Sequence, residues 1–254
     1  MQSLSLAGTG ARLRYHDIPG DGTPLIFVHG LGCASSCDYP PVAGDPVLAG
    51  RRRVLADLLG SGFSDRPEDF DYAVDSHART IAALAESLTP GPVDLYGHSM
   101  GGAVAIAAAT ALGGKVRRLV LSEPNLDPGG GAFSRGIAAM PEADYVAHGH
   151  RDLASSSAAT GNDVWAASLL VSVPRAVHRG AASLVAGGKP SWRDQLLRLA
   201  MPRTVLFGAQ SLPQADAGAL PAHGIAVGIV PAAGHAMAWQ NPGGLAAALN
   251  RALA

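Results

Sequence analysis

The sequence feature that most constrains the fold is the pentapeptide Gly97-His98-Ser99-Met100-Gly101. It follows an apolar stretch at residues 93–96 and precedes an alanine-rich run of helical character at residues 102–112. A Gly-x-Ser-x-Gly between a strand and a helix is typical of the nucleophile elbow, a sharp turn that exposes a serine hydroxyl above the end of a sheet. Such a turn has no room for side chains two positions before and after the serine, and Gly97 and Gly101 meet that need.

Length and charge set the class of protein. A chain of 254 residues, 48% hydrophobic and 15% charged, can bury one sizeable core, and we expect a single domain over residues 1–254 with one insertion. The formal net charge of -1 gives no basic field that would attract nucleic acid or an anionic membrane, so neither is an expected partner. We interpret the basic cluster Arg51-Arg52-Arg53 as a solvated strand entrance, with an anion site as the alternative.

The N-terminal residues bear on the expected cellular location of the protein. Residues 1–20 alternate polar and apolar side chains without a long apolar core, which predicts a hairpin rather than a signal peptide. No stretch approaches the ~20 apolar residues of a membrane span, so we expect a cytoplasmic protein. The oligomeric state stays open, and a homodimer is compatible with the sequence.

Two cysteines, Cys33 and Cys37, lie four positions apart. They are too few for a metal site in the absence of histidines at ligand spacing, and no metal is expected. Without a secretion signal, we interpret them as free, reduced thiols, with a redox pair as the alternative.

Apolar runs and helical patterns alternate along the chain. Residues 74–88 place apolar side chains on one face of a helix. Short, apolar runs predict buried parallel strands at residues 24–28, 53–57, 93–96, 116–121, 203–208 and 226–230. Strands that alternate with helices predict a mostly parallel sheet with helices on both faces.

Four segments carry a resemblance to a known family. They are His29-Gly30-Leu31-Gly32, the glycine- and proline-rich loop at residues 57–67, the pentapeptide around Ser99, and Gly234-His235. In order and spacing they resemble the α/β-hydrolase fold superfamily, over essentially the whole chain except the region after Asn125. The resemblance implies a small helical lid inserted after the sixth strand, at about residues 125–190. Because this fold hosts many chemistries, function has to be argued from the site.

The serine needs a base, and His235 is the candidate. A serine hydroxyl becomes a nucleophile when a base lies within hydrogen-bond reach and an acid fixes the tautomer of that base. His235 follows the apolar strand at residues 226–230 and precedes a helix that starts with Asn241 as N-cap and Pro242 in the first turn. The family carries its catalytic histidine in this loop.

Other histidines receive different interpretations. His98 adjoins the serine, but neighbouring side chains on a sharp turn point apart, so we expect it to pack rather than to react. His29 is expected to brace the loop that follows the first buried strand. His148, His150 and His178 fall in the insertion. We interpret them as solvated, with a position in the pocket wall as the alternative.

The acid has two candidates, Glu123 and Asp216. The commonest family position lies a few residues after Gly208, where this chain has no carboxylate until Asp216, beyond Pro213. Glu123 instead follows the strand at residues 116–121, at the edge of the sheet where ligands bind. Some α/β-hydrolases, including haloalkane dehalogenases and resorcylic-lactone hydrolases, carry their acid there. We therefore favour Glu123 and keep Asp216 as the alternative.

The resemblance also implies the reaction. The N–H groups of Leu31 and Met100 would form the oxyanion hole, and Ser99 would form an acyl-enzyme without metal or organic cofactor. Haloalkane dehalogenases and epoxide hydrolases need an aspartate nucleophile, so a serine disfavours both. Esters and lactones are the expected substrates. Carbon–carbon bonds next to carbonyls are one alternative, and a ligand-binding or lyase member of the fold without hydrolytic activity is another.

Three residues are candidates for substrate contact. Trp165 lies in the insertion, where it serves as lid core or as pocket wall, and Met237 and Trp239 follow His235 closely. The sequence has no charged fork that would bind a phosphate or a carboxylate. We therefore expect a small to medium, mainly apolar ester or lactone as the substrate.

Overall fold

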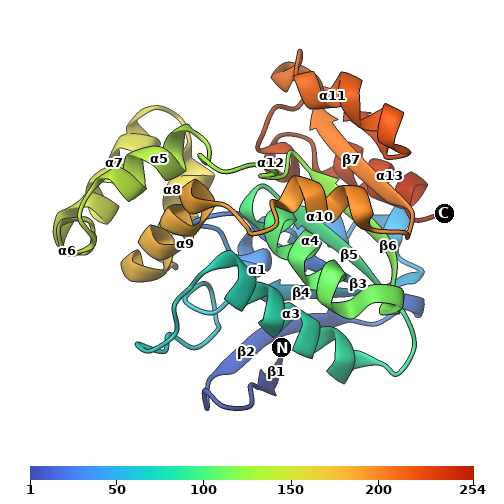
Figure 1. Cartoon of the computed structure of the whole chain (residues 1–254), viewed down its shortest axis with the longest axis horizontal. Helices are drawn as coiled ribbons and strands as arrows, with labels where there is room; N and C mark the ends of the chain where they lie inside the picture. Colours follow the sequence, from blue (N-terminus) through green and yellow to red (C-terminus); the bar gives the residue numbers. More distant parts are fainter.

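An eight-stranded sheet forms the centre of the computed structural model, which describes all residues 1–254 (Figure 1). The strand order is β1-β2-β4-β3-β5-β6-β7-β8. β1 pairs antiparallel with β2 and β2 antiparallel with β4, whereas every other pair is parallel. The strands are β1 Gln2–Ser5, β2 Arg12–Ile18, β3 Asp21–Val28, β4 Arg51–Asp57, β5 Val93–His98, β6 Val116–Ser122, β7 Arg203–Gly208 and β8 Ala226–Val230. The predicted hairpin and the mostly parallel sheet are confirmed.

Helices cover both faces of the sheet. The longer ones outside the insertion are α3 Val74–Leu88, α4 Met100–Leu112, α10 Trp192–Arg198 and α13 Pro242–Ala252. Apolar residues of α3, α4 and α10 belong to one core, and those of α13 to another. Shorter helices are α1 Ser35–Asp38, α2 Pro40–Ala43, α11 Ala215–Ala219 and α12 Met237–Gln240. Four 3-10 turns complete this part, at Pro46–Leu48, Gly113–Lys115, Ala209–Ser211 and Leu220–His223.

The second half of β3, residues 24–28, is continuously apolar because both of its faces are covered. Ile26 and Val28 belong to the core under α3 and α4, whereas Leu25 and Phe27 belong to the core under α13. All four are fully buried. Because side chains alternate between the faces of a strand, a strand covered on both faces buries every residue.

Two predicted helices occur as expected. α3 spans Val74–Leu88 and buries Ile81 and Leu84 against the sheet. α13 begins at Pro242, and the side chain of its N-cap Asn241 accepts a hydrogen bond from the N–H of Gly244 at 2.9 Å. Such a cap satisfies one of the N–H groups that the first turn of a helix leaves without a partner. No helix is both long and apolar enough to span a membrane.

The interpretation of the basic cluster at β4 is wrong for Arg53. Its side chain is buried and donates hydrogen bonds to the carbonyl oxygens of Ala43 and Pro19, at 3.0 and 2.7 Å. Its neighbour Arg52 forms an ion pair with Asp17. Arg53 therefore ties the start of the strand to its surroundings rather than facing solvent.

A helical insertion lies between β6 and β7, to one side of the sheet (Figure 1). It contains α5 Ala132–Ala139, α6 Glu142–Asp144, a π-helical turn at Tyr145–Gly149, α7 His150–Ala159, α8 Asp163–Leu170 and α9 Pro174–Ala186. Its own small core includes Tyr145, Leu169 and Val177. The predicted helical lid is confirmed.

Two of the insertion's histidines are buried, contrary to the interpretation as solvated side chains. His150 is hydrogen-bonded to the Tyr145 hydroxyl and to the carbonyl of Leu169, at 3.0 and 2.9 Å. His178 is hydrogen-bonded to the carbonyl of Met140 at 2.8 Å. Neither lines the cavity described below, and His148 is exposed. These rings hold the insertion together.

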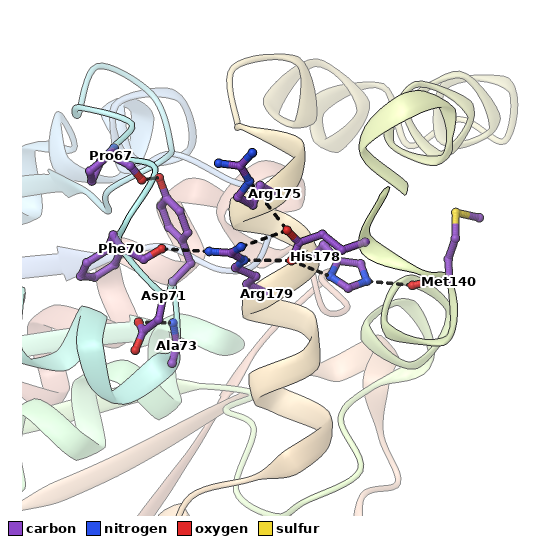
Figure 2. Close-up of polar contacts among 10 residues, drawn as sticks. Pro67, Phe70, Asp71, Ala73, Met140, Arg175, His178 and Arg179 are labelled. Atoms are coloured by element: carbon purple, nitrogen blue, oxygen red, sulfur yellow. Dashed lines mark hydrogen bonds and ion pairs between the residues drawn. The ribbon is translucent and has the colours of Figure 1, made fainter. Parts of the chain in front are cut away.

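A polar cluster fastens the insertion to the loop before α3 (Figure 2). Arg179 on α9 donates two hydrogen bonds to the carboxylate of Glu142, at 2.8 and 3.0 Å, and a third to the carbonyl of Phe70 at 3.3 Å. Arg175 adds an ion pair to Glu142 at 3.7 Å. The Arg179 guanidinium holds the pKa of Glu142 below its usual range. A bidentate arginine–carboxylate pair fixes geometry as well as charge, so Glu142 of α6 orients the Arg179 guanidinium. The hydrogen bond from Arg179 to the carbonyl of Phe70 then joins α9 to the loop that leads into α3.

The turn between β5 and α4 depends on glycines. A Cβ on Gly97 would overlap the carbonyl of Gly101, and a Cβ on Gly101 would overlap the carbonyl oxygens of Val28 and His29. α4 therefore packs its first turn directly against the end of β3. Glycine is needed at both positions, as predicted. The reason lies in close contacts with neighbouring backbone atoms as well as in the turn itself.

We expect Gly101→Ala to lower the free energy of unfolding by about 2–3 kcal/mol, because the backbone of β3 has to shift to admit the methyl group. Urea unfolding measures this change. Gly114→Ala is the matched control, since its added Cβ has no heavy atom within 4 Å, and its stability should stay within about 0.5 kcal/mol of the wild type. Equal stabilities of the two variants would contradict the steric argument.

Candidate active site

Ser99 lies at the turn between β5 and α4 with a strained backbone. Its φ and ψ are 53° and -120°, a conformation that non-glycine residues rarely adopt. Hydrogen bonds hold it there: its N–H donates to the carbonyl of Ser122 at 3.0 Å, and its carbonyl accepts from the N–H groups of Gly102 and Asn125. Strain that the surroundings enforce in this way is typical of functional sites.

Glu123 directly follows β6 and also has a positive φ, of 38°. Its side chain is 6% exposed. One carboxylate oxygen, Oε1, accepts a hydrogen bond from the N–H of Gly208 at the end of β7, at 3.0 Å. The other, Oε2, accepts from Nδ1 of His235 at 2.7 Å. The carboxylate thus joins the ends of three neighbouring strands.

The environment keeps Glu123 ionised. Burial raises the pKa of its carboxyl, but hydrogen bonds from His235, Gly208 and Ser211 outweigh burial and lower the pKa to about 2. An ionised partner requires a proton on Nδ1 of His235 and leaves Nε2 to act as acceptor. This is the tautomer that a histidine base needs.

His235 lies in the loop between β8 and α12, with a side chain 57% exposed. It lines the same cavity as Ser99. Its Nδ1 is engaged by Glu123, and no hydrogen bond joins its ring to the Ser99 hydroxyl in this structure. Such contacts often tighten only when substrate binds.

His98 packs against His235, as predicted for a residue next to the serine. The two ring centroids are 4.7 Å apart. Nδ1 of His98 lies 3.0 Å from the hydroxyl of Ser122, which fixes the ring. Burial, followed by the proximity of His235, lowers the pKa of His98 to about 3. His98 is therefore a neutral ring at physiological pH that supports His235 from the side.

Asp216, the alternative acid, does not reach His235. It lies in α11, and its two carboxylate oxygens accept hydrogen bonds from Arg193 at 2.8 and 3.1 Å. Arg193 also binds Asp127 at the start of the insertion. Of the two carboxylates considered from the sequence, only Glu123 contacts the histidine.

The two expected oxyanion donors border the site. Met100 is the first residue of α4, so its N–H has no acceptor within the helix. Leu31 lines the cavity, and its N–H makes no hydrogen bond within the protein. Its carbonyl accepts a hydrogen bond from Nε1 of Trp165 at 3.0 Å. The insertion thereby holds the loop that carries Leu31.

His29 braces this loop, as expected. The ring is buried, with Nδ1 hydrogen-bonded to the carbonyl of Gly30 at 2.9 Å. Its Nε2 accepts from the N–H of Leu58 at 3.0 Å. Burial lowers the pKa of His29, in keeping with a neutral ring that donates from one nitrogen and accepts at the other.

A cavity of about 420 Å³ opens above Ser99 and His235. Trp165 and Trp239 line it, and Trp165 is at the same time part of the insertion's core. Met237 does not line the cavity, so its assignment to substrate contact is wrong. Its side chain points into the core between the sheet and α13, where it is 1% exposed.

The sequence reasoning missed several cavity residues. Phe133 packs against Trp165 with ring centroids 4.6 Å apart, and Asp38, Asn125 and Asn162 supply polar side chains. No lysine or arginine lines the cavity. Asp38 lies six residues after the glycine loop, and this closeness in the sequence could have placed it at the cavity. Phe133 and Asn162 reach the cavity only through the packing of the insertion.

Both cysteines are free thiols, in agreement with the favoured interpretation. Cys33 is buried and lines the cavity, and burial raises the pKa of its thiol well above the usual value. Cys37 is exposed. The structure contains no group of three or more His, Cys, Asp or Glu side chains that could hold a metal ion.

Comparisons with known proteins agree with this fold. A family model described as "alpha/beta hydrolase fold" matches residues 23–240. The 2-hydroxy-6-oxo-2,4-heptadienoate hydrolase of Pseudomonas putida F1 is 39% identical over 119 residues, which are 46% of this chain and 42% of that protein. The chain therefore matches less than half the length of this curated relative.

Two solved structures match nearly the whole chain. An esterase from Thermogutta terrifontis is 22% identical with a TM-score of 0.81, over 100% of this chain and 98% of that one. An N-acyl homoserine lactonase, solved with N-butanoyl homoserine, is 19% identical with a TM-score of 0.74, over 100% and 96% of the two chains. At these identities the likeness concerns the fold alone.

The depressed pKa of Glu123 makes stability depend on pH. Its ordinary value is 4.5 and its folded value is about 2, so its contribution is fully present above about pH 4.5 and is lost as the pH falls towards 2. We expect the difference in unfolding free energy between wild type and Glu123→Gln to shrink by about 2 kcal/mol between about pH 6 and about pH 3. Denaturant unfolding at each pH measures it. A difference that stays constant over this range would contradict the stabilisation of the ionised Glu123 carboxylate by these hydrogen bonds.

Proposed function

The chain belongs to the α/β-hydrolase fold family, and from this premise we propose that it is a serine hydrolase that cleaves a carboxylic ester or a lactone. The observation that carries the proposal is the 2.7 Å hydrogen bond between His235 Nδ1 and Glu123, beside a strained Ser99 that lines the same cavity. A serine, a histidine oriented by a carboxylate and two free N–H donors are the parts that acyl transfer needs.

In the proposed mechanism, Oγ of Ser99 attacks the carbonyl carbon while Nε2 of His235 takes the hydroxyl proton. Glu123 stabilises the imidazolium that forms. The N–H groups of Leu31 and Met100 stabilise the developing oxyanion, and loss of one such donor typically costs ~10² to 10³ in rate. The imidazolium then protonates the leaving alcohol, which leaves an acyl-enzyme on Ser99.

The second half repeats the first with water as the nucleophile. His235 takes a proton from water, the hydroxide adds to the acyl carbon, and the tetrahedral intermediate expels Ser99. The imidazolium returns its proton to Oγ, and the carboxylic acid leaves. For a lactone, the alcohol and the acid remain in one molecule.

The cavity supports an uncharged substrate of small to medium size. Its volume of about 420 Å³ is typical of small-ligand sites. Trp165, Phe133 and Trp239 give it apolar aromatic walls, and no cationic side chain is present to bind an anion. Both features favour an ester or a lactone that carries no charged group.

A second candidate is the hydrolysis of a carbon–carbon bond next to a carbonyl, by the same three residues. The 39% identity to the 2-hydroxy-6-oxo-2,4-heptadienoate hydrolase favours it. The name of that relative describes a carboxylate substrate, whereas the cavity of this chain has no lysine or arginine to pair with a carboxylate. We therefore place ester and lactone hydrolysis first.

The test is turnover of a panel of 4-nitrophenyl esters, lactones and 1,5-diketones by wild type and Ser99→Ala. We expect wild type to cleave esters or lactones and Ser99→Ala to lose a factor of about 10⁴ or more in kcat/KM, because no other group can form the acyl-enzyme. Asp216→Asn is the matched control and should keep its activity, since Asp216 pairs with Arg193 and not with His235. Ester turnover retained in Ser99→Ala would contradict the mechanism, and cleavage of diketones alone would favour the second candidate.

A further inference from the structure

A buried carboxyl group, Asp38, lines the cavity without a task in the proposed mechanism. It is the last residue of α1 and is 3% exposed. Charged side chains are almost never buried to this extent unless they are paired. Asp38 forms no ion pair, so its retention in the wall of a mainly apolar cavity calls for a partner.

The hydrogen-bonding capacity of Asp38 is largely unused. The hydroxyl of Ser168 donates to Oδ1 at 3.4 Å, which is a long hydrogen bond, and Oδ2 accepts none from the protein. A carboxylate has about four acceptor positions, and buried polar groups are normally satisfied. The unused acceptors belong to a side chain that borders the cavity.

A buried indole N–H lies beside it. Nε1 of Trp239 has no other hydrogen-bond partner and lies close enough to the Asp38 carboxylate to lower the pKa of that carboxyl. An indole N–H can only donate, and an ionised carboxylate can only accept, so Trp239 is matched to Asp38 itself. The acceptor capacity left on Oδ2 matches a ligand group that donates, such as a hydroxyl or an amide N–H.

The charge of Asp38 responds to pH near neutrality. Burial raises the pKa of its carboxyl to about 7, against the lowering effect of the neighbouring Cys33, Ser168 and Trp239 side chains, and Asp57 raises it further. The other titratable groups that face Asp38 or share its cavity are Tyr39, Tyr96, His98, Glu123 and His235. None of these is a lysine or an arginine that would pair with an anionic ligand next to Asp38.

We propose that Asp38 is a specificity determinant that selects esters or lactones carrying an uncharged hydrogen-bond donor, a hydroxyl or an amide N–H, and rejects those carrying a carboxylate. The proposal rests on the ester or lactone hydrolysis proposed above. A matched hydroxyl would donate to Oδ2 of Asp38, which accepts no hydrogen bond from the protein. A carboxylate in the same place would meet the charge of Asp38 in a poorly solvated cavity, where like charges repel strongly.

The experiment compares three series of methyl esters of straight-chain acids, whose far ends carry a methyl, a hydroxyl or a carboxylate group. For each chain length, kcat/KM is measured by release of methanol for wild type, Asp38→Asn and Cys37→Ser. The methyl-ended ester is the internal reference, so every result is a ratio of kcat/KM values. Cys37 lies on the same short helix as Asp38 but is exposed and does not line the cavity, which makes Cys37→Ser the matched control.

We expect wild type and Cys37→Ser to prefer the hydroxyl-ended over the methyl-ended ester by about tenfold or more, and to disfavour the carboxylate-ended ester by a similar factor. In Asp38→Asn the discrimination against the carboxylate should fall by about tenfold, because an amide carries no charge and can donate to it. The same ratios in Asp38→Asn as in wild type would overturn the proposal and leave Asp38 a structural partner of Ser168. If wild type cleaves none of the three series, the proposed function itself fails.

A pH series separates specificity from a merely structural role. In wild type, the kcat/KM ratio of carboxylate-ended to methyl-ended ester should fall about tenfold between about pH 6 and about pH 8.5, since Asp38 ionises over this range. In Asp38→Asn the ratio should stay flat. Because Glu123 is ionised throughout, it does not contribute to the change. A fall that persists in Asp38→Asn would overturn the proposal.

Discussion

The hydrogen bonds accepted by the Glu123 carboxylate are the constraint on which the site depends. Glu123 follows β6. Its carboxylate accepts hydrogen bonds from the N–H of Gly208 at the end of β7 and from Nδ1 of His235 after β8. Parallel pairing of these three strands in register brings their carboxyl ends together, and a Cβ on Gly208 would overlap the loop that carries His235. The strained backbones of Ser99 and Glu123 follow from the same demand, since each side chain has to leave its strand sharply toward the cavity.

The insertion completes the site that the sheet begins. Trp165 donates to the carbonyl of Leu31, and Ser168 donates to Asp38, so two residues of α8 hold the loop and the short helix that follow β3. On the other side, Arg179 fastens α9 to the loop before α3. Two residues of the cavity wall, Leu31 and Asp38, are therefore held in place by hydrogen bonds from the insertion.

Much of this arrangement could be predicted from the sequence, because its signals are local. The elbow glycines, the apolar strands and the cap at Asn241 each depend on a few neighbouring residues, and Glu123 was recognisable as a carboxylate at a strand end. Predictions failed where distant parts of the chain decide the outcome. Arg53 is buried because carbonyl groups from two other segments accept its hydrogen bonds, and Met237 turns into the core because α13 packs there. The surroundings of Asp38 come from Ser168 of α8 and from Trp239, both more than 100 residues away in the sequence, so they could not be predicted from neighbouring residues.

The most direct test of the central claim is the rate at which a fluorophosphonate probe labels Ser99, mapped by mass spectrometry. This rate reports activation of the serine without knowledge of the substrate. We expect wild type and Asp216→Asn to label at Ser99 at similar rates, and Glu123→Gln to label about 10²-fold or more slowly, because the histidine loses the partner that fixes its tautomer. Labelling of Glu123→Gln as fast as wild type would contradict the claim that Glu123 activates Ser99 through His235.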